Sequence, residues 1–150
     1  MNARAGYTLV ELLIVITILS VLLGIVFGFG LRSLRTSELR EAATSISTDL
    51  IGARSSAQKR SEDVPFSFPR GSAGSTYRIG TRTHTLPGGV TVVCTANCGA
   101  LGANVTNTYT APFGELQNAG QVLSVQRGGV RPFEVRIVGV TGKVIITRTP

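Results

Sequence analysis

An uninterrupted apolar run near the N-terminus is the feature that most constrains how this chain can fold. It extends from Leu12 to Leu31, reads LLIVITILSVLLGIVFGFGL and contains no charged residue. At about 1.5 Å of rise per residue, a helix of this length spans about 30 Å, the hydrocarbon thickness of a bilayer. The run is too long for the apolar region of a secretory signal peptide, and RSLR follows it instead of a small-residue cleavage site. The sequence therefore predicts a single membrane-spanning helix.

Glu11 stands at the head of this run. Burying a carboxylate in lipid costs several kcal/mol, so an intramembrane acid requires a partner. With only one candidate span, the partner must come from another molecule or from a charge created by processing. Cleavage after Gly6 would create the α-amino group of Tyr7, one helical turn before Glu11, and the two charges could neutralise each other within a subunit or between neighbours. Such a pair would set the register of a helical assembly.

The residues after the run form an amphipathic pattern that continues without proline to residue 60. Apolar residues recur mostly at spacings of three and four, while Arg and Glu alternate on the other face. We expect one continuous helix of about 50 residues, ending near Arg60 before the Glu62-Asp63 pair and Pro65. Its apolar positions are Leu31, Leu34, Leu39, Ala42, Ala43, Ile46, Leu50, Ile51, Ala53 and Ala57.

Beyond Pro65 the pattern changes to short runs rich in Val, Ile, Thr, Tyr and Phe, separated by Gly, Pro and Asn. RGG at 127–129 and VTGK at 140–143 are typical of hairpin turns, so the C-terminal third should be an antiparallel meander. The predicted class is α+β: a long N-terminal helix, with a membrane half and an amphipathic half, packed on an antiparallel β-sheet head. We predict strands at about 64–68, 76–80, 90–95, 121–127, 132–139 and 143–148, with a loose break at 97–107.

Cys94 and Cys98 are the two cysteines of the chain, and His84 is its one histidine. These residues are too few for a zinc site, so we predict no metal. A small disulfide-closed loop would place this part of the chain in an oxidising compartment, and a reduced pair at a strand end is the alternative. No nucleophile elbow, P-loop or haem ligand set is visible, so we predict neither an enzyme nor a cofactor. His84 should be an exposed or hydrogen-bonded surface residue.

The net charge of +7 is concentrated toward the C-terminus. Residues 127–150 carry five basic side chains against the single acid Glu134. The charge either keeps the surface soluble or attracts an anionic partner such as nucleic acid. Sequence alone leaves open whether Arg136 and Lys143 face the same way. The candidate DNA-binding residues are Arg131, Arg136, Lys143 and Arg148.

The N-terminus resembles the class III leader of type IV prepilins and type II secretion pseudopilins. A short basic leader ends in Gly6, the sequence YTLVE follows at 7–11, and the apolar run comes next. The resemblance implies that a prepilin peptidase cuts between Gly6 and Tyr7 and methylates the new terminus, and that Glu11 guides docking into a filament of pilin or pseudopilin subunits. It implies a single-pass precursor in the inner membrane and then a periplasmic or extracellular filament. The expected parts are a leader at 1–6, a transmembrane assembly helix at 7–31, an amphipathic helix at 32–62 and a β-sheet head at 63–150.

Two further stretches resemble the minor pseudopilins of the GspH/FimT group. One runs from Leu50 through ARS at 53–55 to Val64, and the other is the closing segment TGKVIITR at 141–148. The resemblance implies a minor pilin or pseudopilin, a structural subunit of a type IV pilus or a type II secretion filament. The alternative is a minor pilin that binds DNA through a basic C-terminal hairpin during natural transformation. DNA-binding members have a Gly-Arg-x-Arg turn, and the matching residues 142–145 here read GKVI.

Overall fold

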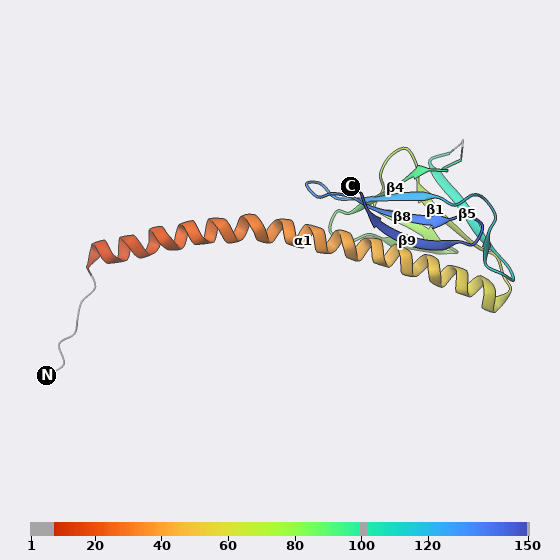
Figure 1. Ribbon diagram of the computed structural model, residues 1–150, viewed down its shortest axis with the longest axis horizontal. Helices are drawn as coiled ribbons and strands as arrows, with labels where there is room; N and C mark the ends of the chain where they lie inside the picture. The colour runs from red at the N-terminus through yellow and green to blue at the C-terminus, as the bar shows by residue number, and fades with distance from the viewer. Residues whose placement is uncertain (1–7, 100–101, 150) are drawn as a thin grey trace. The chain divides into compact units, whose positions relative to one another are not determined.

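The computed structural model describes residues 8–99 and 102–149, without the side chains of residues 27–29. Its single long helix, α1, spans Leu9–Arg60 (Figure 1). The helix ends at the residue where the amphipathic pattern predicts it to end. The chain divides into two compact units, Met1–Leu34 and Arg35–Pro150. We call the first the N-terminal unit and the second the globular unit, and describe each by itself.

The described part of the N-terminal unit is a predominantly apolar helix. Every side chain from Leu9 to Val26 is exposed, and α1 is long and apolar enough over this part to cross a membrane. Its hydroxyls are satisfied within the helix. Thr17 Oγ1 donates to the carbonyls of Leu13 and Ile14 (both 2.8 Å), and Ser20 Oγ donates to that of Ile16 (2.7 Å).

In the globular unit, α1 buries one stripe of side chains against the β-sheets. The stripe follows the spacing of three and four that the sequence shows, and alanines make up much of it. Small side chains allow the helix backbone to approach the strands closely. The buried residues of α1 are Leu39, Ala42, Ala43, Ile46, Leu50, Ala53 and Ala57, with exposed fractions of 0–5%.

Nine described strands form two antiparallel sheets. One sheet has the order β3-β2-β1-β5-β6 and the other has the order β4-β7-β8-β9. In chain order the strands are β1 (Val64–Pro69), β2 (Thr76–Ile79), β3 (Arg82–Thr85), β4 (Thr91–Ala96), β5 (Asn104–Thr110), β6 (Glu115–Leu116), β7 (Val122–Gln126), β8 (Phe133–Val138) and β9 (Lys143–Arg148). The predicted α+β class and the C-terminal meander β7-β8-β9 are confirmed.

The core of the globular unit lies between α1 and the two sheets. Aromatic rings of the five-stranded sheet contact one another there. Ring centroids are 5.1 Å apart for Phe66 and Tyr109, and 5.3 Å apart for Phe68 and Tyr77. The four-stranded sheet contributes smaller side chains, Val92, Leu123, Val125, Val135 and Ile137, each at most 3% exposed.

Three strands lie where the sequence patterns predict none. β3 and β6 were not predicted, and β5 begins inside the segment 97–107 that was predicted to be a loop. β5 is nevertheless central, because it pairs with both β1 and β6. The loop prediction was wrong because Asn104 and Asn107 are poor strand formers by composition, whereas tertiary contacts decide their conformation here.

Candidate functional site

Glu11 lies in the first turn of α1, and the turn is capped by the residue before the helix. Thr8 Oγ1 accepts a hydrogen bond from the Glu11 backbone N–H (3.2 Å), and the Thr8 carbonyl accepts one from the Leu12 N–H (3.2 Å). Thr8 is therefore the N-cap residue, and Glu11 occupies the third helical position. A carboxylate there is favoured by the partial positive charge of a helix N-terminus. The sequence T-x-x-E is a capping-box pattern that the sequence analysis did not use.

The rest of the predicted processing and docking site is only partly visible. Gly6 and Tyr7 lie outside the described residues. Among the residues that the structure describes, no basic side chain forms an ion pair with Glu11. The carboxylate stands at one end of an exposed apolar helix, which is where the sequence predicts an assembly contact.

The four basic residues predicted to bind DNA do not form one surface. Directly opposed residues of β8 and β9 share a face, and the register pairs Arg136 with Ile145 and Val138 with Lys143. Arg136 and Lys143 therefore lie on one face, away from the core. Arg148 lies on the other face, where its guanidinium carbon is 5.8 Å from the centroid of the Phe133 ring.

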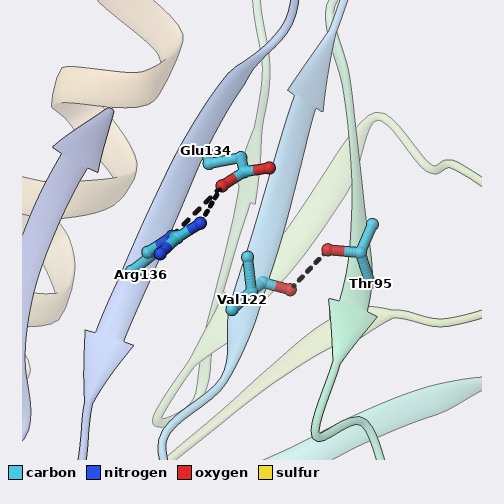
Figure 2. Close-up of polar contacts among 4 residues, drawn as sticks. All are labelled: Thr95, Val122, Glu134 and Arg136. Atoms are coloured by element: carbon cyan, nitrogen blue, oxygen red, sulfur yellow. Dashed lines mark hydrogen bonds and ion pairs between the residues drawn. The ribbon is translucent and has the colours of Figure 1, made fainter. Parts of the chain in front are cut away.

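The charge of Arg136 is already paired within its own strand. Its guanidinium donates two hydrogen bonds to Glu134 Oε2, at 2.8 and 3.1 Å (Figure 2). Arg131 is exposed in the loop before β8. Two of the four candidates, Arg136 and Lys143, lie on the outer face of the β8–β9 hairpin. Of these two, only Arg136 has a described partner that neutralises its charge, and Lys143 has no neutralising or aromatic contact with a described residue.

A disulfide joins Cys94 in β4 to Cys98, which is the first of the two states considered for this pair. Cys94 is buried, and the ladder with β7 has a register shift, as at a β-bulge, between Cys94 and Ala96. Asn97 adopts a positive φ of 57° between the cysteines, and its Nδ2 donates to the carbonyl of Gly120 (2.7 Å). The loop is thus fastened both covalently and by hydrogen bonding.

One polar cluster of the globular unit was missed by the sequence analysis. Asp49 of α1 accepts a hydrogen bond from the Tyr77 hydroxyl at Oδ2 (2.5 Å), and His84 Nδ1 lies 2.9 Å from the same oxygen. The rings of Tyr77 and His84 stack with centroids 5.1 Å apart. His84 is therefore hydrogen-bonded at the surface, one of the two states expected for it. No sequence motif links these positions, because 28 residues separate Asp49 from Tyr77.

Burial of the tyrosine hydroxyls changes their acidity. Burial, together with the hydrogen bond to Asp49, raises the pKa of Tyr77 well above its usual value. Burial also raises the pKa of Tyr109 to about 12, against the opposing effect of the Arg54 guanidinium. Both groups are therefore held in the neutral form.

In the described part of the chain, no group of three or more His, Cys, Asp and Glu side chains is placed to hold a metal ion.

The family comparison matches the N-terminal segment. Residues 1–27 match the model of the prokaryotic N-terminal methylation motif. This range includes Gly6, Tyr7 and Glu11. A search of curated proteins gives no significant match.

Comparison with solved structures matches the fold. The chain is similar to the type IV minor pilin FimU of Pseudomonas aeruginosa (strain PAO1) in space group P21, with a TM-score of 0.57 and 18% identity over 77% of this chain and 91% of FimU. The P65 crystal form gives a TM-score of 0.53 and 18% identity over 74% of this chain and 92% of FimU. The chain thus carries a prokaryotic N-terminal methylation motif at residues 1–27 and has a fold similar to that of the type IV minor pilin FimU.

Proposed function

We propose that the chain is a minor structural subunit of a pilin-type filament. A prepilin peptidase cleaves it between Gly6 and Tyr7 and methylates the new N-terminus, and the apolar helix then packs with those of other pilin subunits. The match to the N-terminal methylation motif supports the processing step. The two matched structures are crystal forms of one type IV minor pilin, FimU, which favours a type IV pilus over a type II secretion filament.

The observation that carries this proposal is the position of Glu11 on an exposed apolar helix. All side chains from Leu9 to Val26 are exposed, so a bilayer or other helices must cover them. A carboxylate at that end is stable in an apolar surrounding only when a positive charge neutralises it. The amino group that cleavage creates on Tyr7 supplies such a charge. The Cys94–Cys98 disulfide supports a location of the globular unit outside the cytoplasm.

Intact mass of the chain co-expressed with a prepilin peptidase tests the processing step. We expect loss of residues 1–6 and a gain of one methyl group, whereas a Gly6→Leu variant should keep its full length. A wild-type chain that retains residues 1–6 beside an active peptidase would contradict the cleavage proposal.

Recovery in sheared filaments tests the role of Glu11. Glu11→Gln should be processed normally, yet its recovery should fall at least about tenfold, because one charge of a pair in low dielectric is lost. Glu41→Gln, on an exposed part of the same helix, is the matched control and should assemble as the wild type does. Equal recovery of both variants would show that Glu11 does not guide docking.

DNA capture through the C-terminal hairpin stays a prediction and is not our preferred function. Phosphate binding requires several free cations on one face. Of the four candidates only Arg136 and Lys143 share a face, and Glu134 already pairs with Arg136.

A further inference from the structure

β9 is an edge strand, because no other described strand pairs with its outer side. It pairs with β8 through six consecutive residue pairs and with no other described strand. The opposite edge of the same sheet is protected. There Gly74 and Val92 exchange two backbone hydrogen bonds, of 3.0 and 2.8 Å, along the outer side of β4. The four-stranded sheet therefore has one side at which another strand can add.

The hydrogen bonds of the ladder show which backbone groups of β9 are free. The Thr149 N–H donates to the Pro132 carbonyl directly across from it (3.3 Å), and bonded and non-bonded pairs alternate along an antiparallel ladder. The Ile137 N–H donates to the Gln121 carbonyl on the β7 side (2.8 Å). This fits the alternation, because it makes Ile137 and Val144 a non-bonded pair of the β8–β9 ladder. The residues of β9 whose N–H and C=O groups point away from β8 are therefore Val144, Ile146 and Arg148.

The side chains of β9 are also mostly exposed to solvent. Five of its six residues are exposed, and the exception, Val144, is half-buried. Ile145 is 38% exposed and Ile146 is 37% exposed, although they lie on opposite faces. With Val138 and Val140, they are four of the six exposed large hydrophobic residues described in the globular unit, the other two being Ile51 and Phe113. Proline, bulges, short length and charged side chains usually protect an edge strand, and β9 has only the charges, on Lys143 and Arg148 at its two ends.

Charge indicates what kind of strand fits this edge. Lys143 begins β9 and Arg148 ends it, about 17 Å apart at 3.4 Å per residue. Neither forms an ion pair with a described residue. A second copy of β9 would bring four cations together, which disfavours self-pairing. A strand with acidic residues at both ends would neutralise both cations.

We propose that β9 is a docking edge for an extended, acidic-flanked segment of another protein, which adds as a fifth strand to the sheet. The free backbone groups of Val144, Ile146 and Arg148 supply the main-chain hydrogen bonds, as in other cases of strand addition. Lys143 and Arg148 select the acidic flanks. DNA would use the cations alone and leave the amides and the apolar side chains without partners. The proposal does not depend on cleavage at Gly6 or on Glu11.

The test uses the full chain in detergent micelles and a synthetic peptide in which alternating Val and Thr residues are flanked by Glu. Amide hydrogen exchange should slow at least about tenfold at Val144, Ile146 and Arg148 when the peptide binds. Ile146→Pro removes an outward N–H but no bond to β8, and should weaken peptide binding about tenfold. Ile146→Ala keeps the N–H and is the matched control for the lost side chain.

Charge controls separate this proposal from simple electrostatic attraction. A peptide flanked by Lys, and a Lys143→Gln/Arg148→Gln variant with the Glu-flanked peptide, should each bind at least about tenfold more weakly at low salt. If circular dichroism shows that Ile146→Pro does not fold, two other measurements test the proposal: the amide hydrogen exchange of the unaltered chain and the peptide affinity of the charge variant.

Two outcomes would overturn the proposal. One is that the outward amides remain unprotected at a saturating concentration of peptide. The other is that duplex DNA binds with a strong salt dependence, the peptide does not bind, and Ile146→Pro leaves DNA binding unchanged. The second outcome would identify a phosphate-binding surface in place of a strand-docking edge.

Discussion

Asp49 shows how one side chain joins three elements of the globular unit. Its Oδ2 atom contacts the Tyr77 hydroxyl of β2 and His84 Nδ1 of β3, while Asp49 itself belongs to α1. A partly buried carboxylate accepts charge-assisted hydrogen bonds. Removing one of its donors therefore lowers the free energy of unfolding. The stacked rings of Phe68, Tyr77 and His84 hold the two donors in position.

Stability of the globular unit should fall at alkaline pH because of its buried tyrosines. The folded-state pKa of Tyr77 and of Tyr109 lies above 10, the value expected in the unfolded chain. Below pH 10 neither group changes stability with pH. Above it, the unfolded chain loses protons that the folded chain retains, so the free energy of unfolding falls by about 1.4 kcal/mol per pH unit for each tyrosine. Urea unfolding of the full chain in micelles at a series of pH values measures this slope.

Tyr77→Phe separates the contribution of Tyr77 from other alkaline effects. The variant should lose about 1–3 kcal/mol at neutral pH, because Asp49 loses a hydrogen-bond donor. Its alkaline slope should be shallower by the contribution of one tyrosine. An unchanged slope would show that Tyr77 does not titrate as described.

Residue patterns contain the information for some of these contacts and not for others. Thr8 and Glu11 are three residues apart, so the N-cap of α1 can be found from the sequence alone. The cluster of Asp49, Tyr77 and His84 depends on three elements meeting in space, and no local pattern contains that information. The same holds for the faces of Arg136 and Arg148, which depend on strand register.

At the scale of the element, α1 places neighbouring small residues in opposite environments. Gly52 has no atom within 4 Å of where a Cβ would lie, whereas Ala53 is 5% exposed in the core. Gly52→Ala should raise the free energy of unfolding by about 1 kcal/mol through helix propensity. Ala53→Leu should lower it by about 1–3 kcal/mol, because the added atoms crowd a packed interface. Urea unfolding of both variants checks the pair, and equal effects would contradict this orientation of the helix.

The strands differ in how clearly the sequence indicates them. β1, β4, β7, β8 and β9 carry Val, Ile, Leu or Phe at alternating or consecutive positions, and the patterns predict them within two residues at each end. β5 reads NVTNTYT, and two of the three hydrogen bonds of its buried Asn107 side chain join it to a later segment, at Asn118 and Ala119. Asn107 Oδ1 accepts from the N–H of Thr108 and of Asn118, and its Nδ2 donates to the Ala119 carbonyl. These contacts exist only after the chain has folded.

At the scale of the whole molecule, the described buried core belongs to the globular unit. The first buried hydrophobic residue along the described chain is Leu39, beyond the division at Leu34. A chain that starts at Arg35 should therefore fold with the same thermal midpoint as the full chain in micelles, within experimental error. Circular dichroism of the two proteins measures this. A truncated chain that is unfolded would show that the N-terminal unit contributes to the core.

The bonding of Thr17 and Ser20 has a consequence for how α1 is recognised by its neighbours. Both hydroxyls donate to carbonyls of their own helix. The segment from Leu12 to Val26 is therefore a largely apolar cylinder that offers a neighbouring helix no free hydroxyl donor. Packed among similar helices, such a cylinder could rotate about its axis or slide along it at little cost. Glu11, at the end of this segment, can therefore fix both the rotation of the helix about its axis and its axial position relative to its neighbours.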